Sequence, residues 1–243
     1  MSPIVAVNAV TVRFGGLVAL DTVGFRVAGG EIVGLIGPNG AGKTTLFSTL
    51  MGLVRPSAGS ICLEDHRVDG MKPHLIARRA MTKTFQNTAL FPQMSLVENV
   101  MTAAVVHGSV QEARAEALRC LELVGLRRVA EQPVRSLTFP QKALAEVARA
   151  LATRPKVLLL DEVMAALTHV EMDEVMASLR RLRDEQGITL IIVEHHMRAI
   201  MGLSDRVLVL NFGRLIAEGS PAEVSRNPDV LTAYLGHSHD AHH

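Results

Sequence analysis

Hydrophobic and polar positions in the first third of the chain alternate, or gather in short apolar runs, as they do in β-strands. A glycine-rich segment interrupts this pattern and leads into a helical stretch that ends near Gly52. The pattern therefore predicts an N-terminal β-rich part, with strands in residues 7–14, 24–27, 31–37, 60–65 and 81–86.

The middle of the chain follows a different period. Between residues 95 and 153, apolar side chains recur every three to four positions, which places them on one face of a helix. Ser95 and Glu98 have the spacing of a capping box. Pro140 lies where a helix beginning at Gln141 should start, and proline is tolerated there because the first N–H groups have no partner within the helix. The pattern predicts an all-helical insert.

Strand and helix patterns alternate again in the last third of the chain. The apolar runs 157–162 and 189–195 are separated by the amphipathic stretch 171–186, and a hairpin is expected around Phe212–Gly213. Apolar strands separated by helices indicate a parallel sheet covered on both faces. We expect an α/β fold with a mostly parallel core sheet and an antiparallel β portion near the N-terminus. One domain is predicted over residues 1–243, with a core of 1–94 and 154–236, a helical part of about 95–153 and a disordered tail of 237–243.

Composition narrows the classes of function. The chain carries 25 basic and 24 acidic side chains, a formal net charge of +1, so we expect no binding of nucleic acid through bulk positive charge. With 48% hydrophobic residues it can fold around a core. The N-terminus has no basic stretch followed by an apolar one, and no run of about eighteen apolar residues occurs. We therefore expect a cytoplasmic protein that does not span the membrane.

Cysteines and histidines add no predicted metal site. Cys62 and Cys120 lie in neither a CxxC nor a metal-ligand spacing, so free thiols in a reducing compartment are the expected state. Residues 237–243 include four histidines, but nothing in the sequence fixes these side chains in space. A disordered tail is therefore favoured over a metal site.

The segment GLIGPNGAGKTT, residues 34–45, is the strongest chemical motif. It fits the pattern G-x-x-x-x-G-K-[ST] after an apolar strand and before a helix, the context in which this pattern binds phosphates. The glycines let backbone N–H groups surround the β- and γ-phosphates, Lys43 adds a positive charge, and the Thr44 hydroxyl can coordinate Mg²⁺. We therefore predict a site for a nucleoside triphosphate. Its loop residues are Gly37, Pro38, Asn39, Gly40, Ala41, Gly42, Lys43, Thr44 and Thr45.

Polar and aromatic residues elsewhere suit the same chemistry. Asp161 and Glu162 end an apolar run, where a parallel strand would place Asp161 near the magnesium ion and Glu162 near an attacking water molecule. His195 ends the next apolar run and could contact a γ-phosphate, or be an ordinary loop histidine. Gln86 could bring its amide oxygen to Mg²⁺, or lie in a surface loop. Phe14 could stack on adenine, or belong to the core.

The order of these motifs resembles that of the nucleotide-binding subunit of an ABC transporter, over roughly Val5 to Leu235. More narrowly, the chain is similar to the ATPase subunits of branched-chain amino-acid importers. That similarity is carried by VRFGGLVALDTVGF, LFPQMSLVENV, VRSLTFPQKALAEVARALATRPKVLLLDE and MGLSDRVLVLNFGRLIAEGSPAEV.

The resemblance implies an ATPase that couples ATP hydrolysis to import, with ATP and Mg²⁺ as cofactors and Phe14 stacked on adenine. The residues to which it gives catalytic or metal-binding roles are Glu162, His195, Gln86, Thr44 and Asp161. It also implies a signature segment that covers the ATP of a partner subunit, formed by Leu137, Thr138, Phe139, Pro140 and Gln141. The implied partners are permease subunits at the inner face of the cell membrane, a second ATP-binding subunit and, indirectly, a substrate-binding protein.

Two segments depart from the pattern of that family. Its signature is commonly Leu-Ser-x-Gly-Gln, whereas Pro140 replaces the glycine whose N–H approaches the γ-phosphate, and proline has no N–H. Ala166 and Thr168 lie where the family tends to have a glycine and an Asn or Asp. Because both segments face the implied partner, one hypothesis is a heterodimer in which the site completed by residues 137–141 turns over slowly. The alternative is neutral substitution with little kinetic effect.

Other functions fit only parts of the sequence. A soluble ABC protein of repair or translation usually has two tandem cassettes or a long coiled insertion, and 243 residues in this layout hold neither. A module that binds nucleotide without hydrolysing it is disfavoured by Glu162 and His195 and slightly favoured by the segment LTFPQ. Import of branched-chain or other hydrophobic amino acids is the leading expectation, with other small amides or carboxylates as alternative substrates.

Overall fold

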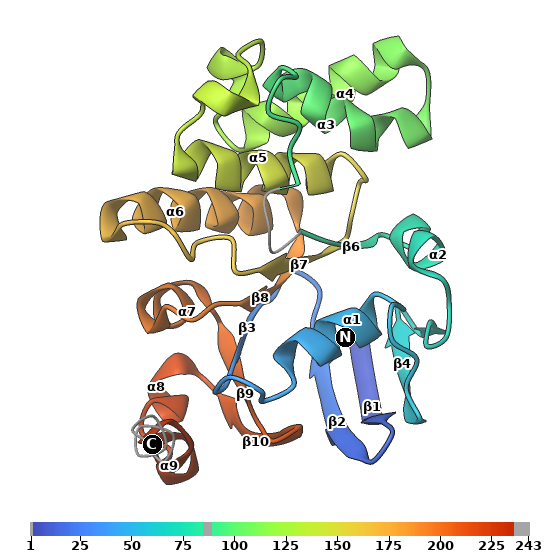
Figure 1. Ribbon diagram of the computed structural model, residues 1–243, viewed down its shortest axis with the longest axis vertical. Helices are drawn as coiled ribbons and strands as arrows, with labels where there is room; N and C mark the ends of the chain where they lie inside the picture. Colours follow the sequence, from blue (N-terminus) through green and yellow to red (C-terminus); the bar gives the residue numbers. More distant parts are fainter. Residues whose placement is uncertain (1, 85–88, 236–243) are drawn as a thin grey trace.

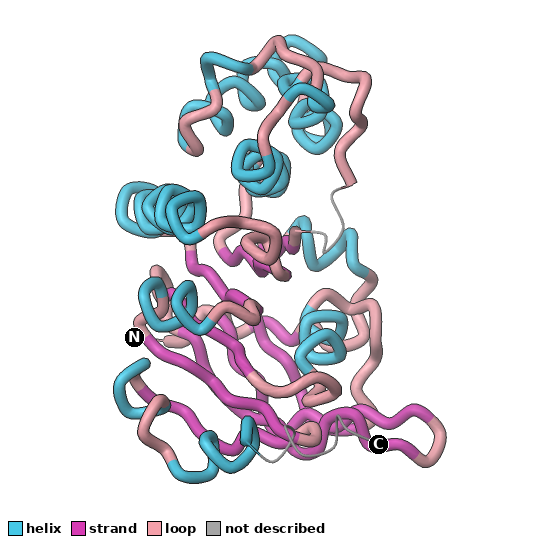
Figure 2. The backbone as a smooth tube through the Cα atoms, turned by 60° about the vertical axis from the view of Figure 1, so that its left-hand side comes forward, coloured by secondary structure: helices cyan, strands magenta, loops and turns pink. Residues whose placement is uncertain are grey.

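The computed structural model describes residues 2–84 and 89–235, so the predicted Gln86 and the histidine-containing tail lie outside the described residues. Figure 1 shows the helices of residues 96–151 at one end of the molecule, and strands β1 (Val5–Phe14) and β2 (Leu17–Val27) at the other. Two sheets and the helices packed on them form the molecule (Figure 2), and the predicted α/β fold is confirmed.

The larger sheet is mostly parallel, as predicted. Its strands are β3 (Ile32–Ile36), β6 (Met81–Lys83), β7 (Val157–Asp161), β8 (Thr189–Val193), β9 (Arg206–Asn211) and β10 (Arg214–Gly219). In the described residues they lie in the order β10-β9-β3-β8-β7-β6, and of the neighbouring pairs only β9 and β10 are antiparallel. Every residue of β3, β7 and β8 is buried, as expected for a parallel sheet covered on both faces.

The smaller sheet is the predicted antiparallel portion. It adds β4 (Ala58–Leu63) and β5 (His66–Arg67) to β1 and β2, in the order β2-β1-β4-β5. The expected strand at 24–27 is only the end of β2, which starts at Leu17 and pairs with nearly the whole of β1. The sequence pattern missed its first half because the inward and outward positions shift at bulges in this pair.

Two hydrophobic clusters cover the two faces of the larger sheet. Val33 and Leu35 of β3 belong to the cluster that includes helix α1 (Lys43–Leu50) and the smaller sheet. Ile32 and Ile36 belong to the cluster that includes α5 (Phe139–Leu151) and α6 (His169–Gln186). Because side chains alternate between the two faces of a strand, β3, which leads into the phosphate loop, packs into both hydrophobic clusters.

Helices α3 (Leu96–Ala104) and α4 (Val110–Leu123) pack on each other and on α5, where a helical segment was predicted. The capping box of α3 is confirmed, since the Ser95 side chain accepts the Glu98 N–H and Glu98 accepts the Ser95 N–H. The expected start of α5 at Gln141 is wrong by two residues. Thr138 caps the helix, and its N–H donates to the Gln141 Oε1 at 3.0 Å, so the helix begins at Phe139 with Pro140 buried in its second position.

Several short helices were not predicted, because each is too brief to give a clear period. They are α2 (Pro73–Arg78), α7 (Met197–Leu203), α8 (Pro221–Val224) and α9 (Pro228–Leu235), whereas the single turns η1 (Val105–His107), η2 (Arg127–Val129) and η3 (Val134–Ser136) lie within the predicted helical insert. Within residues 2–84 and 89–235, no helix has the length and apolar character needed to cross a membrane.

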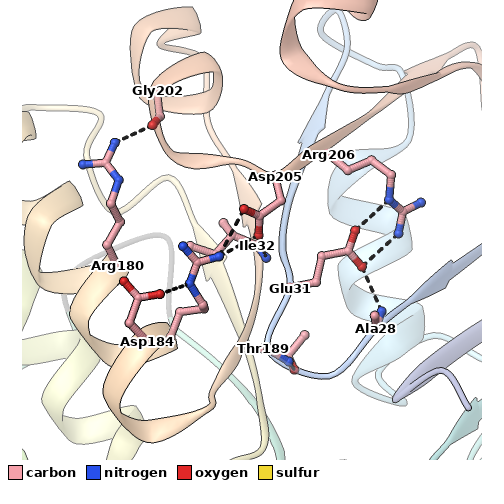
Figure 3. Close-up of polar contacts among 11 residues, drawn as sticks. Ala28, Glu31, Ile32, Arg180, Asp184, Thr189, Gly202, Asp205 and Arg206 are labelled. Carbon is pink, nitrogen blue, oxygen red and sulfur yellow. Dashed lines mark hydrogen bonds and ion pairs between the residues drawn. The ribbon is translucent and has the colours of Figure 1, made fainter. Parts of the chain in front are cut away.

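Ion pairs fix the start of β3, at the end of the strand away from the phosphate loop (Figure 3). The Ile32 N–H donates to the Asp205 Oδ2 at 2.8 Å, and the same oxygen lies 2.8 Å from the Arg183 Nη1. Glu31 pairs with Arg206, with 2.7 Å between Oε1 and Nε. These contacts hold the strand whose other end presents the phosphate loop.

Candidate functional site

Residues 37–42 turn the chain from the end of β3 into α1. Gly40 and Gly42 have φ angles of 77° and 106°, a region that side-chain-bearing residues rarely adopt. At Gly37 a Cβ atom would lie 2.1 Å from the Leu210 carbonyl oxygen, so this position has no room for a side chain. Glycine is therefore required by the fold, and the resulting turn presents backbone N–H groups at the N-terminus of α1, where anions bind.

Lys43 is the first residue of α1, and its side chain folds back over the loop. Its Nζ donates to the Gly37 carbonyl oxygen at 2.7 Å and to the Pro38 carbonyl oxygen at 3.0 Å. The residue is only 7% exposed, and burial lowers the pKa of its ammonium group while the charges of Glu162 and Asp161 oppose that shift. A phosphate near the loop would meet a cation that is already positioned and poorly hydrated.

Asp161 ends β7 and is almost fully buried. Its N–H donates to the Thr84 Oγ1 at 3.1 Å, and its Oδ2 lies 3.9 Å from the Lys83 Nζ. Burial raises the pKa of its carboxyl group, and the neighbouring Lys83 charge lowers it. The charged form of a buried carboxylate such as this one is stabilised when a cation lies close to it.

The donor set fits Mg²⁺ only together with phosphate oxygens. Among the described residues, no group of three or more His, Cys, Asp and Glu side chains could hold a metal ion. Mg²⁺ usually takes one or two protein oxygens and completes its shell with water and substrate phosphates. Asp161 and the exposed Thr44 hydroxyl beside the phosphate loop could supply those protein oxygens.

Glu162 and His195 come together from neighbouring strands. The His195 Nε2 lies 2.8 Å from the Glu162 Oε1, because β7 and β8 are adjacent and the two residues follow their ends. Glu162 has a φ of 54°, and its N–H donates to the Val193 carbonyl oxygen at 2.9 Å. The backbone at Glu162 is therefore held in a conformation that costs free energy, as is common in active sites.

A cavity of about 620 Å³ opens beside the phosphate loop. Two exposed aromatic rings line it together with Glu162 and His195: Phe14, at 51% exposure, and Phe212, at 73%. Phe14 ends β1, and Phe212 occupies the predicted hairpin turn between β9 and β10. The residues that line the cavity are Phe14, Leu17, Val18, Ala19, Asn39, Gly40, Ala41, Gly42, Lys43, Thr44, Thr45, Glu162, His195, Phe212 and Gly213.

The structure brings most of the predicted nucleotide and catalytic residues to this cavity. Gly37 and Pro38 lie beneath Lys43, and Asp161 is buried next to Glu162. The predicted signature, residues 137–141, lies at the start of α5 and does not line the cavity. This separation is what a segment acting on another subunit's nucleotide requires.

Sequence reasoning missed four residues near the site: Phe212, Lys83, Thr84 and Glu194. Glu194 is 2% exposed, and burial, together with the charges of Glu162 and Asp161, raises the pKa of its carboxyl group to about 7. An acidic residue that directly follows a run of apolar strand residues was the available sequence signal for Glu194.

Known proteins resemble this chain in sequence and in fold. Residues 20–165 match the family model described as ABC transporter, and residues 214–240 match the one described as branched-chain amino acid ATP-binding cassette transporter. The branched-chain amino acid transport ATP-binding protein BraF of Pseudomonas aeruginosa is 39% identical, covering 96% of this chain and 98% of BraF. LivG of Escherichia coli K12, also a branched-chain amino acid transport ATP-binding protein, is 38% identical, covering 96% of this chain and 98% of LivG.

Solved structures agree with the fold. The ADP conformation of MJ1267, an ATP-binding cassette of an ABC transporter, superposes with a TM-score of 0.89 at 26% identity, covering 97% of this chain and all of that one. The dimeric post-hydrolysis state of the cassette MJ0796, bound to ADP and Pi, gives a TM-score of 0.77 at 27% identity and covers 89% of this chain and 98% of that one.

Proposed function

The chain belongs to the ABC transporter family of ATP-binding proteins, and we propose that it is the ATP-hydrolysing, energy-coupling subunit of an importer of branched-chain or other hydrophobic amino acids. The main observation in favour of ATPase activity is the contact between Glu162 and His195 beside an intact phosphate loop. The observation that carries the substrate class is the similarity to BraF and LivG over nearly the whole chain.

ATP would lie with its phosphates on the N-terminus of α1 and its base toward Phe14. The backbone N–H groups of residues 39–45 donate to the phosphates, and Lys43 exchanges its bonds to loop carbonyl oxygens for bonds to the β- and γ-phosphates. The Phe14 ring stacks on adenine, and Phe212 lies along the same cavity. Thr44 and Asp161 would hold Mg²⁺, which would supply positive charge to offset that of the phosphates.

Hydrolysis needs a base and a group that stabilises the γ-phosphate. Glu162 lines the cavity wall, and its carboxylate acts as the base that accepts a proton from the attacking water. His195 lines the same wall and donates to the γ-phosphate oxygens, while its 2.8 Å contact with Glu162 keeps both side chains oriented. Gln86, the other predicted Mg²⁺ ligand, lies outside the described residues.

The proposed assembly contains permease subunits, a second ATP-binding subunit and a substrate-binding protein outside the membrane, with this chain on the inner face. Residues 137–141 of this chain would cover the partner's ATP. Thr138 and Phe139 are exposed at the start of α5, whereas Pro140 is buried and offers no N–H. We propose that the missing donor slows turnover at the site that this segment completes, in a heterodimer whose other site is completed by the partner's signature.

Uptake by the reconstituted complex tests the proposed function. Proteoliposomes that contain this chain, its permeases and its binding protein should accumulate labelled leucine only with ATP inside. Lys43→Ala should abolish uptake, and Glu31→Gln, far from the cavity, should leave it unchanged. Failure to import any of leucine, isoleucine, valine, phenylalanine and methionine while ATP is hydrolysed would refute the substrate class, and uptake by the Lys43 variant would refute the energy-coupling role.

A further inference from the structure

Glu194 directly follows β8 and directly precedes His195. It is 2% exposed, so its carboxyl group is almost completely shielded from water. Burial of an acidic side chain is costly, and such residues are usually retained for the hydrogen bonds that they make. The partners of this carboxyl group therefore indicate what the residue does.

The Glu194 carboxyl group bridges two segments of the active site. Its Oε1 accepts the Met164 N–H at 2.7 Å, while its buried Oε2 has no hydrogen-bond partner among the described residues. Met164 lies two residues after Glu162, in the loop between β7 and α6. The side chain of the residue directly before His195 thus holds the segment that directly follows Glu162.

A second contact joins the same two segments. The His196 Nε2 lies 3.3 Å from the Ala165 carbonyl oxygen, next to Met164. Glu194 and His196, on either side of His195, therefore hold two neighbouring residues of the loop, Met164 and Ala165. The Glu194 bond is the shorter and the more buried of the two, so it should dominate.

We propose that Glu194 is a positioning residue for ATP hydrolysis: by binding the Met164 N–H it fixes the loop after Glu162 against the end of β8 and so sets the distance between Glu162 and His195. This inference rests on the proposed ATPase function. Glu194 does not line the cavity, so it is not among the groups that would contact ATP. Loss of the bond should therefore lower kcat and leave ATP binding nearly unchanged.

Two substitutions at Glu194 separate positioning from simple filling of space. Glu194→Gln keeps an oxygen that can accept the Met164 N–H, whereas Glu194→Leu has a similar volume and no acceptor. Glu31→Leu is the matched control, because Glu31 also accepts a backbone N–H, that of Ala28 at 2.8 Å, but at the opposite end of the sheet (Figure 3).

We expect Glu194→Leu to lower the kcat of the reconstituted transporter by about 10- to 100-fold, with Glu194→Gln within about threefold of wild type. Binding of a fluorescent ATP analogue to the purified full chain should stay within about twofold in both variants. Glu31→Leu should reduce the thermal midpoint of unfolding without this loss of kcat.

Three results would overturn the proposal: a Glu194→Leu transporter with wild-type kcat, a Glu194→Gln transporter as impaired as Glu194→Leu, or a loss of ATP affinity that matches the loss of kcat. Thermal unfolding and analogue binding establish that each variant is folded. If the wild-type complex itself hydrolyses no ATP, the proposed function fails instead, and that outcome is distinct from all three.

Discussion

Replacing Glu194 by glutamine should stabilise the folded chain increasingly as the pH rises. Burial, aided by the charges of Glu162 and Asp161, raises the pKa of the Glu194 carboxyl group from 4.5 to about 7. The folded chain therefore keeps this proton at pH values where the unfolded chain has lost it. The unfolding free energy of the wild type must fall between about pH 4.5 and pH 7 and stay lower above that range. Glutamine does not titrate and escapes this loss.

The size of the effect follows from the shift. A rise from 4.5 to about 7 is about 2.5 units, and each unit corresponds to about 1.4 kcal/mol, so the full cost is about 3 kcal/mol. Glutamine also keeps an acceptor for the Met164 N–H, which lies 2.7 Å from the Glu194 Oε1. Glu194→Gln should therefore exceed the wild type by up to about 3 kcal/mol near pH 8 and by almost nothing near pH 4.

Urea unfolding followed by circular dichroism, in steps across this pH range without nucleotide or magnesium, measures the difference. Glu98→Gln is a control of opposite sign, because hydrogen bonds from Ser95 lower the pKa of Glu98. That variant should be less stable than wild type at neutral pH, and the difference should shrink as the pH falls. A Glu194→Gln difference that does not change with pH, or a variant less stable than wild type near pH 8, would refute the reasoning.

Three further predictions concern the nucleotide site. Gly37→Ala should abolish ATP binding or cost about 3 kcal/mol of unfolding free energy, because its Cβ would lie 2.1 Å from a carbonyl oxygen; a stable, binding-competent variant in calorimetry would contradict this. Phe14→Ala should weaken ATP binding about tenfold, and Phe212→Ala by less, in titrations with a fluorescent analogue; equal affinities would exclude stacking. Pro140→Gly should speed hydrolysis at the partner's site up to about tenfold in single-turnover assays, and an unchanged rate would favour neutral substitution.

The phosphate loop could be predicted because its chemistry is local. Its spacing of glycines, Lys43 and Thr44 fixes the turn from a strand into a helix without reference to the rest of the fold. The helices α3 and α4 were predicted for the same reason, since apolar period and capping residues lie close together in sequence. Helices of less than two turns, such as α7 and α8, contain too few apolar positions for a helical periodicity to be recognised in the sequence.

Contacts between distant segments could not be predicted from the residues alone. The Glu162–His195 contact depends on β7 and β8 being neighbours, which sequence periodicity does not specify. The bond from Met164 to Glu194 depends in addition on how the loop after β7 turns back. Likewise, the sequence predicted Phe212 only as a turn residue. It lies beside the phosphate loop because the neighbouring Gly213 N–H donates to the Ala41 carbonyl oxygen, with 2.9 Å between nitrogen and oxygen.

The ATPase rate of the reconstituted transporter with Glu162→Gln tests the central claim most directly. Glutamine keeps the shape of Glu162 but cannot accept the proton of the attacking water. We expect the rate to fall at least about 100-fold, with the affinity for an ATP analogue within about twofold of wild type. Hydrolysis by this variant near the wild-type rate would contradict the assignment of Glu162 as the base.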